Sequence, residues 1–288
     1  MLPVLLAPLP SSVSSSSLGE NYEINKSKKQ KQKIIKHMKN DTLPLVCREN
    51  KLLLEVRLAN TKVAFLVDSG ANVSVLPRDV VKEAGLLGSL EPFKACLSNP
   101  VAQYSPTIHG VLREPLHCSQ GVVLRPMLVV MSPAIPILGL ETLTFYRGVL
   151  TCCRARPSLQ LRQLHPPTPL PFLNRATYVS CTIMGQEMSA LLDTGSTCCF
   201  MSYRQAKELR LKIRRVKSVG AATITGTLPI TGCTSGAHVT FLGMSATTSF
   251  HINDVEEKVV IGLNVLLDIK MCLHFDAKTI SKGGRADH

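Results

Sequence analysis

Apolar and polar residues alternate along short stretches of this chain, in the pattern of half-buried β-strands. Leu52–Leu58 alternates towards its end, and Val63–Val67 is an apolar run that follows a turn at Ala59–Thr61. The same succession returns over Tyr178–Ile183 and Met188–Leu192. Each pair of stretches predicts a β-hairpin whose second strand is buried.

The rest of the pattern also predicts mostly strands. Helical segments are expected only at Arg78–Ala84, between Pro77 and Gly85, and at Tyr203–Leu209. Further strands are expected at Val73–Leu76, Val122–Met131 with a break at Pro126, Gly148–Cys152, Gly220–Gly232 as a strand pair, Val239–Leu242, Thr247–Ile252, Val259–Ile261 and Met271–Phe275. Many short strands with one short helix per unit predict an all-β, barrel-like fold rather than βαβ units.

The chain contains an internal repeat. Asp68-Ser69-Gly70 and Asp193-Thr194-Gly195 each follow an apolar run, and the two aspartates are 125 residues apart. A second landmark, two apolar residues before a glycine, recurs 71 residues after the first aspartate and 69 residues after the second. Repetition of several features at one offset indicates two homologous units.

Composition places the boundaries of these units. We expect a disordered basic tail over residues 1–44, a first domain over 45–155, a linker over 156–171 and a second domain over 172–288. The linker is rich in proline, so we expect an extended, semi-stiff spacer that is open to proteolysis. Its prolines are Pro157, Pro166, Pro167, Pro169 and Pro171.

Bulk composition narrows the class of protein. Of the 288 residues, 45% are hydrophobic and 18% are charged, as in globular proteins. No apolar run reaches the roughly 20 residues of a membrane helix, so no membrane contact is expected. The apolar opening lacks a basic leading region and contains three prolines, which disfavours a secretory signal.

The ten cysteines form no CxxC motif, and no histidine stands at zinc-finger spacing. We therefore predict reduced thiols, no metal, no cofactor, and a cytoplasmic or nuclear location. The adjacent Cys198 and Cys199 are interpreted as buried packing residues, with redox control as the less favoured alternative.

The net charge of +13 is unevenly distributed. Seven lysines and no acidic residue lie between Lys26 and Lys39. Such a block can contact nucleic acid, direct nuclear import, or remain a solvated arm. The sequence leaves these readings open, with the solvated arm favoured.

The repeated aspartate is the candidate for chemistry. An isolated Asp-Ser-Gly or Asp-Thr-Gly marks a turn in most proteins. Here both aspartates end a fully apolar strand, and charged groups are rarely left at a buried position without a partner or a task. The residues that follow each triplet are small, and no basic residue adjoins either aspartate.

These motifs resemble those of the retropepsin-like aspartic proteases, the group of retroviral and retrotransposon proteases. The matching segments are LVDSGA at Leu66–Ala71, LLDTGS at Leu191–Ser196, ILGL at Ile137–Leu140 and VIGL at Val260–Leu263. The resemblance implies two tandem retropepsin-like β-barrel units, paired within one chain as a pseudo-dimer. It also implies an aspartic endopeptidase, derived from a retroelement, that needs neither metal nor cofactor.

The resemblance assigns roles to residues. Asp68 and Asp193 are the expected catalytic pair, which shares one proton, activates a water and cleaves an extended polypeptide. In that family a flap hairpin closes over the substrate, and the prolines before Gly110 make the first-unit flap unlike a standard one. The expected loop supports are Ser69, Gly70, Ala71, Thr194, Gly195 and Ser196, and the flap candidates are Ile108, Gly110, Thr225 and Gly226.

Two alternatives remain open at the level of sequence. The chain could be a protease-shaped module that binds a protein partner and cleaves little, because fold alone does not establish activity. Each unit could also pair with another copy of the chain, which would make homodimerisation necessary for a complete site.

Overall fold

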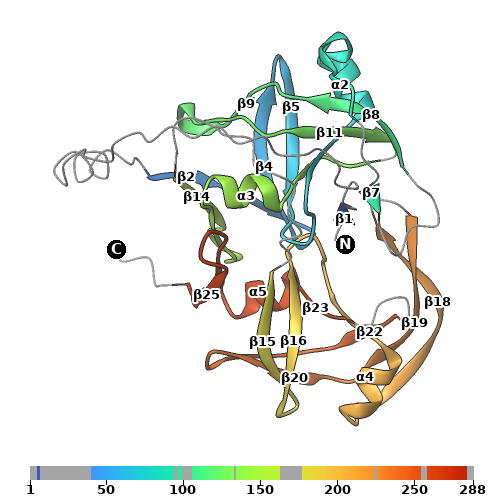
Figure 1. The fold of residues 1–288 in the computed structure, drawn as a ribbon. Coiled ribbons are helices and arrows are strands. Elements are labelled where there is room, and N and C mark those ends of the chain that lie inside the picture. The colour runs from blue at the N-terminus through green and yellow to red at the C-terminus, as the bar shows by residue number, and fades with distance from the viewer. Residues whose placement is uncertain are drawn as a thin grey trace, which may run out of the picture.

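The structure is a computed structural model. It describes residues 5–6, 40–93, 97–98, 106–132, 134–162, 177–223, 226–253 and 258–283. Within these ranges strands dominate and helices are short, so the predicted all-β class is confirmed (Figure 1). None of the described helices is both long and apolar enough to span a membrane.

The first of two large sheets has the strand order β10-β9-β4-β5-β12-β6-β11-β8, with β3 paired to β4 outside this path. We call β3 to α3 the first half of the chain. Its strands are β3 Val46–Arg48, β4 Lys51–Leu58, β5 Thr61–Val67, β6 Ser74–Pro77, β8 Thr107–Leu112, β9 Leu116–His117, β10 Val123–Leu124, β11 Leu128–Ser132 and β12 Ile137–Leu138.

The second large sheet has the order β18-β19-β22-β17-β23-β16-β15-β20-β21. We call β15 to α5 the second half. Its strands are β15 Tyr178–Ile183, β16 Gln186–Asp193, β17 Cys199–Met201, β18 Ile213–Thr223, β19 Gly226–Thr234, β20 Ala237–Phe241, β21 Met244–Thr248, β22 Phe250–Ile252 and β23 Val259–Gly262.

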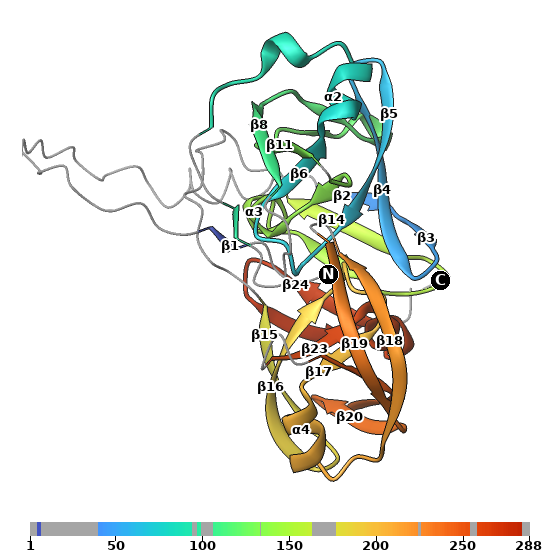
Figure 2. The ribbon, with the colours of Figure 1, turned by 90° about the vertical axis from the view of Figure 1, so that its right-hand side faces the viewer.

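The two sheets have the same topology. Each strand of the first sheet, taken in its order, matches a strand of the second sheet taken in the order β21-β20-β15-β16-β23-β17-β22-β19. In both, the strand that leads to the aspartate pairs in parallel with a later strand, β5 with β12 and β16 with β23. The sequence repeat is therefore a repeat of structure, and the two halves lie one above the other in Figures 1 and 2.

A third sheet joins the halves. Its order is β2-β14-β13-β24-β25, with β13 of the early chain antiparallel to β24 of the late chain. Leu43, Leu150, Leu159 and Leu273 are fully or almost fully buried in it. Its strands are β2 Asn40–Pro44, β13 Val149–Thr151, β14 Ser158–Arg162, β24 Met271–His274 and β25 Thr279–Lys282.

This third sheet corrects two predicted boundaries. Asn40–Pro44 was expected in the tail, but it forms β2 because Leu43 fills a core position opposite Leu159. Ser158–Arg162 was expected in the linker, but it forms β14, whose Leu159 and Leu161 alternate into the core. Residues 163–176, and the tail apart from β1 and β2, lie outside the described residues, as does the lysine block.

Among the described residues each half has two short helices, so the prediction of one helix per unit is wrong. The expected helices are α2 Arg78–Glu83 and α4 Tyr203–Glu208, and the additional ones are α3 Leu140–Phe145 and α5 Leu263–Asp268. The additional helices are short and largely buried, which removes the amphipathic contrast that identifies a helix in sequence. The remaining elements are β1 Leu5–Leu6, β7 Leu97–Ser98 and two 3₁₀ turns at Leu87–Ser89 and Ser119–Gly121.

One large apolar core runs through both halves and the shared sheet. Two smaller apolar clusters are separate from it. One belongs to the first half and contains Leu66, and the other belongs to the second half and contains Leu191. Each of these leucines stands two residues before an aspartate, so strand alternation places it on the same face as that aspartate.

Candidate active site

The two aspartate loops lie at the ends of β5 and β16, where the halves meet. Asp68 directly follows β5, and its amide donates to the carbonyl of Leu138 at 3.1 Å. Asp193 is the last residue of β16 and is paired with Gly262. Both loops are therefore fixed by the parallel strand that carries the second repeated motif.

Four hydrogen bonds connect the loops across the interface. The Ser69 amide donates to Thr194 Oγ1 at 2.9 Å, and the Thr194 amide donates to Ser69 Oγ at 3.1 Å. The Ser69 hydroxyl donates to the Leu192 carbonyl at 2.7 Å, and the Thr194 hydroxyl donates to the Val67 carbonyl at 2.8 Å. Each hydroxyl thus accepts one bond and donates another to the opposite half.

Each carboxylate is oriented by its own loop. Asp68 Oδ1 accepts from the amides of Gly70 at 2.8 Å and Ala71 at 3.1 Å. The second loop repeats this arrangement. Asp193 Oδ1 accepts from the amides of Gly195 at 2.9 Å and Ser196 at 3.2 Å.

The glycines of the triplets allow the carboxylates to approach. A Cβ built on Gly70 would lie 2.6 Å from Asp193 Cγ, and one built on Gly195 would lie 2.3 Å from Asp68 Cγ. Any larger residue would overlap the carboxylate of the opposite half. The structure therefore brings Asp68, Asp193 and all six predicted support residues into one site.

Burial dominates the electrostatics of this site. Asp68 is 1% exposed and Asp193 is fully buried. Burial raises the pKa of Asp68 well above its usual range, and the negative charge of Asp193 and a side-chain hydrogen bond with Asp193 raise it further. The amide of Gly70 opposes this shift without cancelling it. A neutral Asp68 is therefore favoured beside its partner.

Behind the loops, the halves differ in chemistry. In the first half the Ser74 hydroxyl accepts from the Gly139 amide at 2.9 Å, and Glu141 Oε1 accepts from the Ser74 amide at 2.8 Å. In the second half, Cys199 occupies the position that matches Ser74, so a thiol replaces the hydroxyl. Cys199 Sγ accepts from the Gly262 amide at 3.4 Å and donates to Asn264 Oδ1 at 3.5 Å.

Sequence reasoning missed the buried carboxyl in this arrangement. Burial raises the pKa of Glu141, and bonds from Ser74 and Thr142 only partly offset that effect. Among the described residues its Oε2 has no hydrogen-bond partner, and neither do the amide atoms of Asn72. The available signal was the repeat itself, because Glu141 and Asn264 occupy matching positions after the repeated glycines.

The two adjacent cysteines are packing residues in this structure. Cys199 is fully buried, and burial raises its pKa to about 12. Cys198 is partly buried with a raised pKa. Thiols in such surroundings are poor nucleophiles at neutral pH. No disulfide joins the nine cysteines that the structure describes.

The flap candidates divide between the halves. In the second half β18 and β19 form a long antiparallel hairpin, and Gly226 opens β19 opposite Thr223. Thr225 lies outside the described residues. In the first half Ile108 and Gly110 lie within β8, opposite Met131 and Val130 of β11. The structure thus places this second pair inside the sheet rather than at a hairpin tip.

No group of three or more histidine, cysteine, aspartate or glutamate side chains that could hold a metal ion occurs in the ranges that the structure covers. The site chemistry is that of two carboxyls, four loop amides and two bridging hydroxyls. Such a set can hold a water between acidic groups and move a proton to or from it.

One known protein family matches the second half of the chain. Residues 179–268 match the model of the family described as "gag-polyprotein putative aspartyl protease". This part of the chain is retropepsin-like. The match contains Asp193 and its loop, α4, the β18–β19 hairpin and α5, which are the elements that build the second half of the site. No curated protein matches the chain.

Three solved structures of aspartic proteases or protease-like domains align with this chain at identities of 23% or less. The retroviral protease-like domain of Ddi1 from Leishmania major is 23% identical over 37% of this chain and 87% of its own, with a TM-score of 0.32. The EIAV protease complexed with the inhibitor HBY-793 is 17% identical over 35% and 93%, with a TM-score of 0.29. The aspartic proteinase from Irpex lacteus is 10% identical over 84% and 96%, with a TM-score of 0.49.

Proposed function

We propose that the chain is an aspartic endopeptidase whose single active site is built from both halves, with Asp68 and Asp193 sharing one proton. The main support for this proposal is that the two loops exchange hydrogen bonds through Ser69 and Thr194, while the side chains of Asp68 and Asp193 lie within hydrogen-bonding distance of each other. Two carboxyls in direct contact cannot both ionise easily, so the pair titrates as one unit.

The shared proton sets the chemistry. The ionised carboxylate draws a proton from a bound water, and the water oxygen attacks the carbonyl carbon of the peptide bond. The protonated carboxyl donates to the developing oxyanion, which gives a diol, and the proton taken from the water passes to the nitrogen. The C–N bond then breaks, the amine leaves, and one diol hydroxyl returns its proton to the carboxyl pair. No covalent intermediate with the chain forms.

The substrate is a polypeptide held in extended form. The β18–β19 hairpin is the proposed flap, because an extended peptide can add to strand edges through main-chain bonds. The small apolar clusters on the faces of the two aspartates favour apolar side chains on both sides of the cleaved bond. They contain Leu66, Val73, Val75, Val129, Met131 and Ile137 in the first half, and Leu191, Phe200, Leu228, Ile230 and Val260 in the second.

We also propose that the two halves are tandem domains of retroelement origin, paired within the chain. The strand order of the first sheet recurs in the second, which has β18 in addition, and this supports the pairing. The match of the second half to a gag-polyprotein family supports the origin.

Cleavage of an apolar peptide library at mildly acidic pH tests this function. Asp68→Asn and Asp193→Asn are each expected to lower kcat by at least about 10³-fold, because either change removes the shared proton arrangement. The matched control is Asp79→Asn on the exposed face of α2, which should leave kcat unchanged.

A protease-shaped binding module is the second candidate. The near-complete burial of both carboxyls favours it, since water and substrate must reach these groups for hydrolysis. In that case the wild type cleaves no library peptide at any pH, while apolar peptides still bind with the same affinity to wild type and to both Asp→Asn variants.

A further inference from the structure

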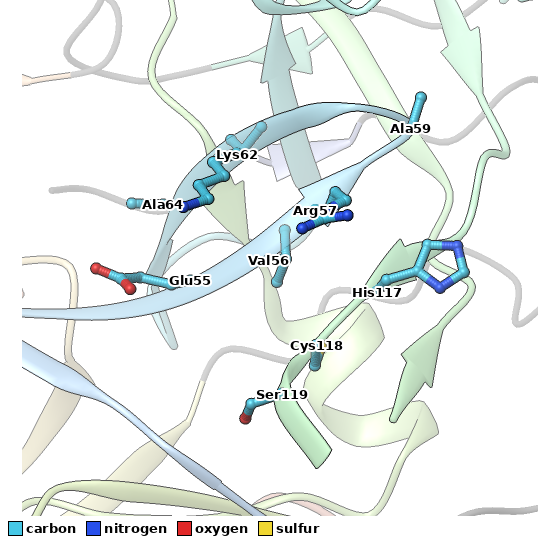
Figure 3. Close-up of a pocket in the computed structure, with 10 residues that line it drawn as sticks. Glu55, Val56, Arg57, Ala59, Lys62, Ala64, His117, Cys118 and Ser119 are labelled. Atoms are coloured by element: carbon cyan, nitrogen blue, oxygen red, sulfur yellow. The ribbon is translucent and has the colours of Figure 1, made fainter. Parts of the chain in front are cut away.

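A groove of about 820 Å³ lies on the first half (Figure 3), and neither Asp68 nor Asp193 is among the residues that line it. Strands β4, β5 and β9 form its floor and contribute outward-facing side chains. The groove is lined by Glu55, Arg57, Lys62, His117, Cys118 and Ser119, among others. Neither the proposed catalysis nor the loop contacts use any of these residues.

Three of these side chains form a row across the strands. Arg57 is the cross-strand partner of Lys62 on β5 and of His117 on β9, and all three residues are exposed. Neighbouring strands are about 4.8 Å apart, so the row spans roughly 10 Å. A single small anion is usually bound by donors that converge on one point, whereas these donors lie in a line.

No acidic residue stands directly opposite Arg57 or Lys62 in the described part of the sheet. Among the described residues neither Arg57 nor Lys62 forms an ion pair or a side-chain hydrogen bond. The one acidic side chain in the groove, Glu55, pairs with Arg48 at 3.4 Å and lies at the opposite end of the groove from His117 (Figure 3). Like charges directly opposite each other destabilise a sheet. A bound anion would relieve this cost.

The second half provides an internal comparison. Thr182 matches Arg57 in position, and its partners are Glu187 on β16 and Thr240 on β20. The same fold therefore forms these three strands without a basic residue at any of the three matching positions. The row of Arg57, Lys62 and His117 is a property of the first half rather than a requirement of the topology.

We propose that this groove binds the phosphate backbone of a nucleic-acid strand. Phosphates repeat along a strand and match a linear row, and the net charge of +13 favours approach of a polyanion. Among the described residues no phenylalanine, tyrosine or tryptophan lines the groove, so we expect contacts to phosphates rather than stacking on bases. An acidic polypeptide has the same sign of charge but carries no obligatory charge at each repeat.

Binding of a fluorescent oligouridylate to the full chain, measured by anisotropy over a range of salt concentrations, tests the proposal. Arg57→Gln/Lys62→Gln should weaken binding by roughly tenfold at low salt and reduce the slope of log K against log salt by about 1.4, at about 0.7 per phosphate contact. Arg78→Gln/Lys82→Gln on α2 removes the same charge from the same half and should change the slope much less.

A gain-of-function variant complements this loss. Thr182→Arg/Glu187→Lys builds two members of the row into the second half and should strengthen binding and steepen the salt slope. The Arg57→Gln/Lys62→Gln variant should unfold at the same or higher urea concentration than wild type, because it removes a like-charge pair, so weaker binding cannot be ascribed to unfolding.

Three results would overturn the proposal. The groove is not the site if its double variant and the α2 double variant have equal affinities and equal salt slopes, or if wild type binds no oligouridylate. The groove instead serves an acidic polypeptide if polyglutamate of equal charge displaces the oligouridylate equally well and loses affinity by the same factor in Arg57→Gln/Lys62→Gln.

Discussion

At the scale of single residues, the structure explains why the repeated triplets have a hydroxyl and a glycine. Ser69 and Thr194 each satisfy an amide and a carbonyl of the opposite loop, which would otherwise be buried without partners. Gly70 and Gly195 leave room for the facing carboxyls. Two different hydroxyl residues perform the same task because only the oxygen position matters.

Replacing the Thr194 hydroxyl by a methyl group, in Thr194→Val, should lower the free energy of unfolding by about 2–4 kcal/mol. The change removes one accepted and one donated bond and leaves a buried amide and a buried carbonyl unsatisfied. Urea denaturation measures the loss. The control is Thr240→Val, at a half-exposed position of β20, which should change the unfolding free energy by less than about 0.5 kcal/mol. Equal losses in both variants would show that the cross-loop bonds contribute nothing special.

Glu141 predicts a dependence of stability on pH. Burial raises its pKa above the ordinary value of 4.5, so the folded chain keeps a proton that the unfolded chain releases. This contribution to stability is complete below pH 4.5 and is lost as pH rises through the folded pKa. Glu141→Gln cannot ionise, so its unfolding free energy should fall less than that of wild type between about pH 4.5 and pH 7. Parallel pH curves for the two proteins would contradict this assignment.

At the scale of elements, the sequence was sufficient where patterns were long and repeated. The hairpins β4–β5 and β15–β16, and helices α2 and α4, could be predicted because alternation and flanking turn residues agree with the fold. The strands β2 and β14 could not, because their burial depends on each other and on β13, which are distant in sequence. Short buried helices such as α3 could not be predicted because they have no polar face.

The third sheet makes β2 part of the folded chain. A variant that begins at Asn40 should have a free energy of unfolding about 2–5 kcal/mol higher than one that begins at Leu45, as measured by urea denaturation. The second variant loses buried Leu43 and the pairing of β2 with β14. Leu43→Ala in the full chain is the matched point variant. If both truncations are equally stable, β2 does not contribute to the shared sheet.

The small apolar clusters predict an asymmetric peptide preference. Phe200 of β17 and Val75 of β6 hold matching positions, seven residues after their aspartates, so the second half has the bulkier wall. Phe200→Val should make the walls alike and raise kcat/KM for peptides with a large apolar residue on that side by about tenfold relative to small ones. Peptide profiling with mass spectrometry measures the ratio. An unchanged profile would remove Phe200 from the substrate wall.

At the scale of the whole molecule, the repeat, the matching strand orders and the shared sheet support the proposed single site built from both halves of one chain. The sequence predicted the two aspartates and their loops, because each signal occurs twice at a fixed offset. It favoured pairing of the halves within the chain and left pairing between chains open. It could not predict the row of Arg57, Lys62 and His117 on the first half, since the cross-strand register of β9 with β4 is a tertiary property. It also could not locate a first-half flap, where the repeat is weakest.

The most direct test of the central claim is a complementation assay of peptide cleavage with Asp68→Asn, Asp193→Asn and an equimolar mixture of the two. One site per chain requires both aspartates in the same molecule, so each variant and the mixture should be inactive while wild type cleaves. Recovery of about a quarter or more of wild-type activity in the mixture would show that the aspartates pair between chains, and would contradict the single-chain site.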